Sequence, residues 1–186
     1  VKDMNISSSL SVYKNCTIDL NGFSISNAVN ENKGSQVINN KGNLTIKDSS
    51  AAKTGIITNA VAEGTAPGEW WGTTQYNYAT NVILNTGVLT IEGGEIFETA
   101  AGSICYAIDN NSSAADAVLT INGGYIHTNA GTAIRMFANS TVKENTVNVN
   151  DGTVEGGYAG IWVQLPGSGK QAKKAALNIT GGELKG

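Results

Sequence analysis

The chain of 186 residues is long enough for one domain with a sizeable core, and its charged fraction of 15% lies well below the usual ~25%. A formal net charge of -3 and a single arginine, Arg135, leave no basic surface for nucleic acid. No run of about 18 apolar residues exists, so we expect no membrane span. Gly is abundant at 23, which favours short strands and tight turns over long helices.

A short phrase of alternating apolar and polar residues recurs along the chain. A divergent first copy occupies residues 16–22, and a looser one residues 44–48. Further copies begin at Leu89, Leu119, Val147 and Leu177, spaced by 28 to 30 residues. Alternation with a period of two predicts a β-strand in each copy.

Other short apolar pieces lie between these copies. One ends in Ile96 or its equivalents, and another recurs as Val37–Asn40, Val82–Asn85, Ala107–Asn110, Ala133–Met136 and Gly160–Val163. Each repeat therefore holds three strands. Asn40, Asn85 and Asn110 follow the third strand at matching positions, which predicts a ladder of asparagine amides at a turn. Lys170–Leu177 contains helix-favouring residues and is expected to form one helical turn.

Two folds can carry this pattern. Asn122-Gly123 and Asp151-Gly152 are hairpin turn signals, so a series of β-hairpins is one alternative. The other is a parallel β-solenoid, in which each residue stacks on its equivalent about 4.8 Å away. Recurrence of like residues at like positions favours the solenoid, right-handed by the crossover rule.

We therefore expect an all-β fold, a single-stranded right-handed parallel β-helix of about five to six three-strand coils. It forms one domain over residues 1–186, with an aromatic-rich loop insertion at 59–80. Cys16 occupies a core position of its ladder in this scheme. Cys105 lies about three coils away, too far for a disulfide.

The opening segment resembles a known class of proteins. Residues 12–25 contain Thr-Ile-Asp-Leu-Asn-Gly followed by Phe-Ser-Ile, which resembles the "TIDLNGxxI" opening common in bacterial surface proteins of the right-handed parallel β-helix, pectate-lyase-like class. The repeated LTIxGGxI phrase, as in Leu89–Ile96, is similar to the same group. Members include adhesin-like modules, polysaccharide lyases and hydrolases, and phage tailspikes. The resemblance implies the fold and leaves the activity open.

The catalytic patterns of that group are not matched here. Its hydrolases use clustered aspartates with a His and an Arg-x-Lys, and its lyases use a calcium-binding acidic cluster with an arginine or lysine base. Arg135 is followed by Met136 and Phe137, and the aspartates are scattered. His127 is the only histidine, which excludes a multi-histidine zinc site. We expect no catalytic residues, no metal site and no cofactor.

Two rows of side chains should point outward. Asp109, Arg135 and Trp162 lie at equivalent sites on successive coils, where Asp109 and Arg135 should form a surface ion pair worth about 0–1 kcal/mol. A second row along the middle strands contains Glu95, Tyr125, His127 and Glu155. Either row could be an ordinary solvated face or a sugar-binding face. Trp70 and Trp71 favour ligand contact near the first row, or they pack on the solenoid wall.

Three functions are compatible with these features. The first is a non-enzymatic, adhesin-like module at the bacterial cell surface that binds a polysaccharide or host glycan. The second is a polysaccharide lyase or hydrolase of the same fold, and the third is a structural spacer. The chain begins with Val1, and no polar layer closes its last coil, so we expect a monomeric module within a longer extracellular protein.

Overall fold

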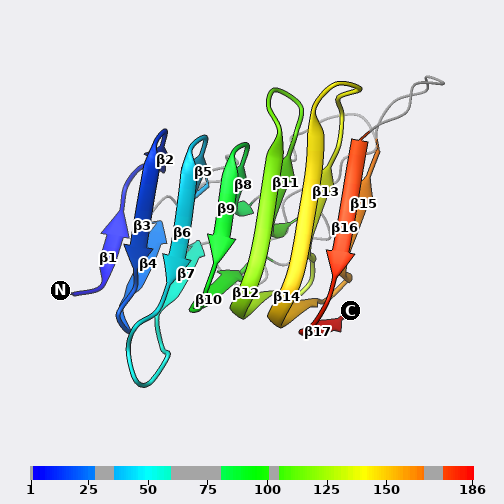
Figure 1. The fold of residues 1–186 in the computed structure, drawn as a ribbon. Helices are drawn as coiled ribbons and strands as arrows, with labels where there is room; N and C mark the ends of the chain where they lie inside the picture. The colour runs from blue at the N-terminus through cyan, green and yellow to red at the C-terminus, as the bar shows by residue number, and fades with distance from the viewer. Residues whose placement is uncertain (1, 28–35, 60–80, 101–104, 166–173) are drawn as a thin grey trace, which may run out of the picture.

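The computed structural model describes residues 2–27, 36–59, 81–100, 105–165 and 174–186. Over these residues the protein is all-β, with strands and no helix. The strands stack in parallel as a β-solenoid of about five turns (Figure 1). The hairpin alternative predicts antiparallel pairs, and the parallel pairing between equivalent strands excludes it.

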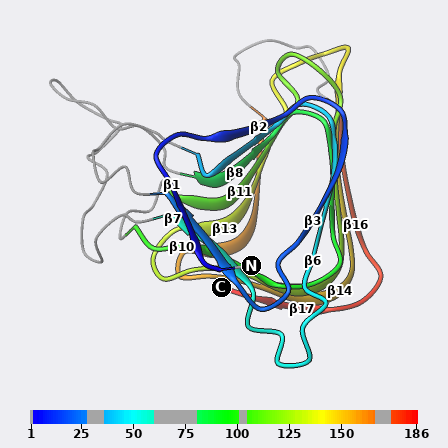
Figure 2. The same cartoon turned by 90° about the vertical axis from the view of Figure 1, so that its left-hand side faces the viewer.

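Each turn of the solenoid has three strands, which form three faces (Figure 2). The first face contains β3 (Asn15–Asp19), β6 (Asn43–Lys47), β9 (Val88–Ile91), the first halves of β12 (Ala117–Thr128) and β14 (Glu144–Gly156), and β16 (Lys174–Ile179). The second face contains β1 (Met4–Ile6), β4 (Ser24–Asn27), β7 (Ile56–Asn59), β10 (Glu95–Glu98), the second halves of β12 and β14, and β17 (Glu183–Lys185). The third face contains β2 (Leu10–Val12), β5 (Ile38–Asn40), β8 (Asn81–Asn85), β11 (Tyr106–Asn111), β13 (Thr132–Phe137) and β15 (Ala159–Gln164).

The strand register confirms the ladders expected from the repeat. Leu44 pairs with Leu89, and Leu89 pairs with Leu119, so like side chains stack from coil to coil. These leucines are fully buried, as are Ile96 and Ile108 on the other two faces. The core is therefore a column of Ile, Leu and Val that runs along the axis of the stack, and each added coil buries another set of apolar side chains.

The predicted asparagine ladder is also present, and it is one member longer than expected. The Nδ2 of Asn40 donates to Oδ1 of Asn85 at 2.8 Å, and Asn85 donates in turn to Asn110 at 2.6 Å. Asn110 donates to Asn145 at 2.8 Å, a residue that comes from the start of β14 rather than from the third face. All four side chains are buried, so the ladder satisfies polar groups that water cannot reach.

The corner between the first and second faces differs from coil to coil. Residues 92–94 suffice to connect β9 to β10, with Gly94 at φ 92°, a conformation that favours glycine. The equivalent Gly124 has φ 93°, and a Cβ there would lie 2.6 Å from the carbonyl oxygen of Gly94. By contrast, residues 48–55 form a longer lobe between β6 and β7, visible in cyan at the lower edge of Figure 1.

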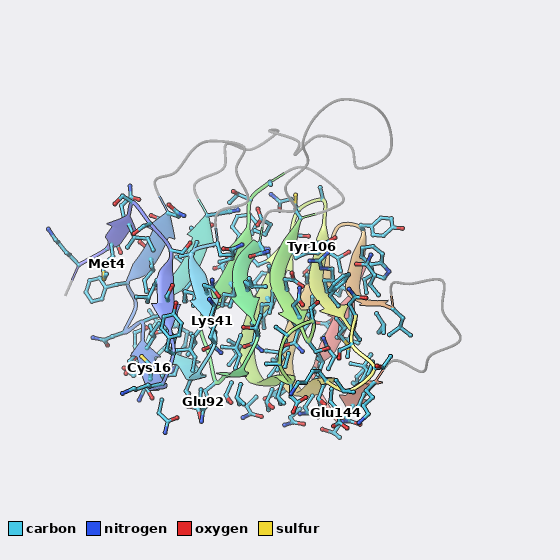
Figure 3. The ribbon with its side chains drawn as sticks, turned by 90° about the horizontal axis from the view of Figure 1, so that it is seen from above. Met4, Cys16, Lys41, Glu92, Tyr106 and Glu144 are labelled. Carbon is cyan, nitrogen blue, oxygen red and sulfur yellow. The ribbon has the colours of Figure 1, made fainter. Side chains whose placement is uncertain are left out.

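The end coils depart from the sequence-based expectations. Cys16 is in register with Leu44 as predicted, but its side chain is exposed, so its assignment to the core is wrong. β3 is the last strand of its sheet, and Figure 3 places Cys16 at the N-terminal end of the stack. Leu177, Ile179 and Leu184 on the last coil are 38–50% exposed for the same reason. An end coil is covered on one side only.

Two further expectations have a clear outcome. Lys174–Ile179 forms strand β16, so the predicted helical turn is wrong over these residues. Cys16 and Cys105 are both thiols, which confirms that no disulfide joins them. The described residues include no helix with the length and apolar character needed to cross a bilayer.

Candidate functional site

The first predicted row lies on the third face. Asp109 on β11 is in register with Arg135 on β13, and Arg135 is in register with Trp162 on β15. The structure therefore brings these three side chains together on successive coils. Trp70 and Trp71, the other residues predicted to contact a ligand here, lie outside the described residues, as does most of the insertion at 59–80. Asn59 itself ends strand β7.

Asp109 and Arg135 form a buried pair rather than the expected surface pair. Nε of Arg135 donates to one carboxylate oxygen at 3.0 Å, and a terminal guanidinium nitrogen donates to the other at 2.5 Å. The side chains are only 3% and 16% exposed, respectively. Both carboxylate oxygens are thus occupied, and the energy expected for an exposed pair does not apply.

Two aromatic residues that the sequence analysis did not include complete this group. The guanidinium carbon of Arg135 lies 4.4 Å from the ring centre of Tyr106 and 4.8 Å from that of Phe137. Tyr106 escaped notice because simple alternation places it on the same side as Ile108. In the structure Ala107 and Ile108 both face the core, so the alternation between inward and outward side chains is broken at this point. Tyr106 therefore points to the side of Arg135 and reaches it.

The surroundings of Arg135 favour its charged form. Burial opposes the charged guanidinium, but the hydrogen bonds to Asp109 and its negative charge outweigh burial and raise the pKa of Arg135. Burial also raises the pKa of the Tyr106 hydroxyl. The group therefore consists of an ion pair held between aromatic rings, with half-buried Trp162 beside it at 6.4 Å from the Tyr106 ring. Its contacts stabilise the fold, and a ligand could reach the Asp109 carboxylate only by displacing Arg135.

The second predicted row lies on the second face, where the structure also brings its members together. Glu95 on β10 is in register with Tyr125 on β12, and His127 on β12 is in register with Phe97 on β10 and Glu155 on β14. We call Glu95, Phe97, Tyr125, His127 and Glu155 the Tyr125 cluster. All five are partly exposed, in contrast to Asp109.

Three rings of the Tyr125 cluster are stacked. His127 lies 4.2 Å from Phe97 and 4.0 Å from Tyr125, measured between ring centres, and the planes deviate by 6° and 5°. Two rings that are both parallel to His127 at this distance must cover its opposite faces. Tyr125 and Phe97 each therefore keep one face that His127 does not cover, as is needed for stacking on the apolar face of a sugar.

Carboxylates hold the polar ends of these rings. Oε1 of Glu95 lies 2.7 Å from Nε2 of His127, and the hydroxyl of Tyr125 donates to Glu155 at 2.8 Å. Burial, the hydrogen bond to Glu155 and the neighbouring carboxylates raise the pKa of Tyr125 to about 12. Nζ of Lys185 lies 4.0 Å from Glu155. Side chains fixed in this way are positioned before a ligand arrives.

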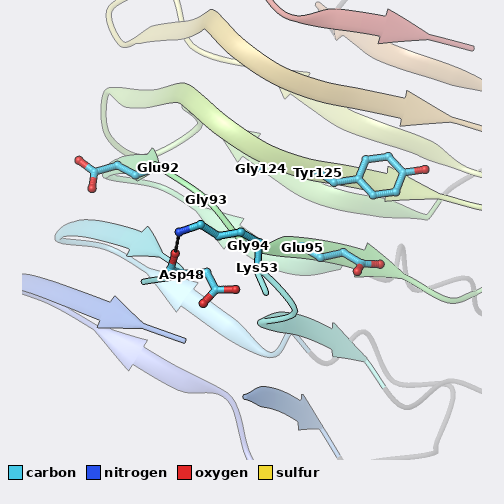
Figure 4. Close-up of a pocket in the computed structure, with 8 residues that line it drawn as sticks. All are labelled: Asp48, Lys53, Glu92, Gly93, Gly94, Glu95, Gly124 and Tyr125. Carbon is cyan, nitrogen blue, oxygen red and sulfur yellow. Dashed lines mark hydrogen bonds between the residues drawn. The ribbon is translucent and has the colours of Figure 1, made fainter. Parts of the chain in front are cut away.

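A pocket of about 450 Å³ adjoins the Tyr125 cluster (Figure 4). Its floor consists of Gly93, Gly94 and Gly124, which have no side chains to fill the space. Asp48, Lys53, Glu92, Glu95 and Tyr125 form its walls. The hollow arises because the long lobe at 48–55 projects beside the tight corners of the following coils. The sequence analysis missed this pocket, although the unequal spacing between the first and second strands signals it.

Asp48 fixes the shape of the pocket from below. Its carboxylate accepts hydrogen bonds from the backbone nitrogens of Gly22 at 2.9 Å, Ser50 at 3.0 Å and Gly55 at 2.7 Å. Burial opposes this charge, but the three bonds outweigh it and lower the pKa of Asp48. Lys53 has φ 54° and donates from Nζ to the carbonyl oxygen of Asp48 at 2.6 Å, which ties the lobe to the pocket wall.

Neither face contains a metal centre among the described residues, where no group of three His, Cys, Asp or Glu side chains could hold a metal ion. No protein-family model, curated protein or solved structure matches the chain.

Proposed function

We propose that this β-solenoid is a carbohydrate-binding module, and that the Tyr125 cluster is its binding surface. The observation that carries the proposal is the stack of three parallel rings between two carboxylates, beside a preformed pocket. Flat rings contact the apolar face of a pyranose, while carboxylate oxygens accept hydrogen bonds from its hydroxyl groups. In this proposal the module belongs to an adhesin-like protein at the bacterial cell surface, related to the pectate-lyase-like β-helix class.

The second face supports this role better than the third face does. Asp109 is 2% exposed and Arg135 occupies both of its oxygens, so this pair offers a ligand few free polar atoms. Glu95 and Glu155 have side chains that are 36% and 41% exposed and can accept further hydrogen bonds. A ligand on the third face would contact chiefly Trp162.

A glycan array followed by titration calorimetry tests the proposal. Removal of the ring in Tyr125→Ala should weaken binding of any glycan hit about 5- to 150-fold, if the stacked sugar contributes as much as a nucleic-acid base stacked on an aromatic side chain, on the order of 1–3 kcal/mol. Tyr125→Phe keeps the ring and should retain most of the affinity. Thermal unfolding of both variants shows whether the fold is intact.

Matched variants on the third face separate the two candidate surfaces. Trp162→Ala should leave binding unchanged. If Trp162→Ala weakens binding and Tyr125→Ala does not, the ligand lies on the third face and the assignment to the Tyr125 cluster is wrong. A blank array would favour the structural spacer, and release of sugar fragments from a polymer would favour the lyase or hydrolase.

A further inference from the structure

The charge of the pocket beside Tyr125 constrains the kind of sugar that could enter it. Three acidic residues line the pocket, Asp48, Glu92 and Glu95, against one basic residue, Lys53. The lining therefore has an excess of negative charge. Such a site repels anionic sugars and attracts cationic groups.

The partners of these groups show which of them a ligand could use. The Asp48 carboxylate is occupied by three backbone nitrogens, and Lys53 is bonded to the Asp48 carbonyl oxygen. Glu95 contacts His127 through one oxygen, and its other oxygen has no hydrogen-bond partner in the described part of the chain. Within that same part, the side chain of Glu92 has neither a hydrogen bond nor an ion pair, and it is exposed.

Glu95 is the acceptor on the side of Tyr125, since the two residues are in register on neighbouring strands. Glu92 and Glu95 stand immediately before and after the Gly93-Gly94 turn, and Figure 4 shows their carboxylates pointing to opposite sides of it. The glycine floor brings a ligand close to the backbone between them. Because Asp48 and Lys53 hold the lobe in place, the pocket exists before binding.

We infer that this pocket is a subsite for an amino sugar with a free amine, which the Glu95 carboxylate binds while the sugar ring packs against Tyr125 and the Glu92 carboxylate, on the other side of the glycine turn, adds electrostatic attraction. The inference rests on the proposed function and narrows its ligand class. Sugars with a carboxylate, such as uronates, carry the charge that this pocket repels and should bind less well.

The test compares three soluble oligosaccharides of equal length by titration calorimetry. The probes are a glucosamine hexamer, the matching N-acetylglucosamine hexamer and a galacturonate hexamer. The glucosamine hexamer should bind most tightly, and its affinity should fall as salt rises. Equal or tighter binding of the neutral or the anionic hexamer would overturn the inference, while glycan binding itself would stand.

Variants locate the effect in the pocket. Glu92→Gln should weaken binding of the glucosamine hexamer about two- to fivefold, the range of one exposed charge pair. Glu144→Gln makes the same change of charge at an exposed site on the first face, away from the pocket, and should have no effect if attraction is local (Figure 3). Equal weakening by both variants would reveal non-specific attraction and overturn the subsite.

A second variant tests the cavity without changing its charge. A Cβ at Gly93 would meet its nearest atom, the Asp48 nitrogen, at 3.6 Å, so Gly93→Leu can be accommodated and would fill the pocket. It should abolish binding of the glucosamine hexamer, and unchanged binding would place the ligand elsewhere. If no glycan on the array binds to the wild-type protein, the proposed function itself fails.

Discussion

Replacement of Asn85 by alanine should destabilise the protein far more than the small change in side-chain volume suggests. Asn85 is fully buried in the asparagine ladder. Its Nδ2 donates to Asn110 at 2.6 Å and to the carbonyl oxygen of Val118 at 3.0 Å, and its Oδ1 accepts from Asn40 at 2.8 Å. Two longer bonds of 3.3 Å join the same side chain to the backbone oxygen and nitrogen of Gly87. Alanine removes all five bonds.

The expected magnitude follows from the partners that remain. A buried polar group left without a hydrogen bond costs about 1–3 kcal/mol. The Asn110 oxygen and the Val118 carbonyl lose a donor, and the backbone nitrogen of Gly87 loses an acceptor, whereas Asn40 keeps its bond to the Val88 oxygen at 2.8 Å. We therefore expect the free energy of unfolding to fall by about 2–5 kcal/mol. Asn85→Leu fills the space and should be destabilising as well, which separates lost hydrogen bonds from an empty cavity.

Urea unfolding monitored by circular dichroism measures this change. Asn150→Ala is the matched control, because Asn150 donates to Asn122 at 2.9 Å from coil to coil at an exposed position. Water replaces that bond, so the control should change the free energy of unfolding by less than about 0.5 kcal/mol. Equal effects of Asn85→Ala and Asn150→Ala would show that burial of the ladder does not matter.

Three other outcomes follow from the described contacts. Arg135→Met leaves the buried Asp109 carboxylate without its cation and should lower the free energy of unfolding, measured by urea titration, by about 3–5 kcal/mol. In the same assay Lys174→Met, at the exposed Lys174–Glu144 pair, should change it by less than about 1 kcal/mol. The difference in tyrosinate absorbance between the wild type and Tyr125→Phe should titrate near pH 12, and Glu155→Gln should lower this pKa of Tyr125. The folded protein keeps the Tyr125 proton at pH values where the unfolded chain, with a pKa of about 10, has lost it. The contribution of Tyr125 to the free energy of unfolding therefore decreases as pH rises from about 10 to 12. In a thiol assay Cys16 should react in the native protein and Cys105 only in denaturant, so two equally fast native thiols would contradict the assigned burial.

The repeat predicted most of the fold because it contains the register. Leu89 and Leu119 occupy equivalent places in the sequence, and a solenoid pairs equivalent places, so strand partners could be assigned before any coordinates. The same logic fails at the ends of the stack. Cys16 has the correct partner but no coil on its other side, and a sequence pattern does not distinguish an end coil from a middle one.

The candidate sites were predictable as rows but not as contacts. The period placed Tyr125 and His127 on one outward face, yet their stacking depends on side-chain rotamers that no spacing specifies. The contact of Tyr106 with Arg135 depends on a break in the alternation at Ala107 and Ile108, which both lie in the core. The pocket depends on the height of the 48–55 lobe above its neighbours, a property of three-dimensional packing.

The coil-by-coil pairing also determines how the protein would respond to mechanical load. The N- and C-termini lie at opposite ends of the stack in Figure 1, so tension between them acts along the axis on which the inter-coil hydrogen bonds lie. A terminal coil can then peel away without disturbing the coils behind it, since each contacts mainly its neighbours. The spacing from Leu89 to its partner Leu119 corresponds to about 100 Å of extended chain per coil. A stretched solenoid of this kind would lengthen in discrete steps, with a longer step for the coil between Leu44 and its partner Leu89, and would limit the peak force on whatever it tethers.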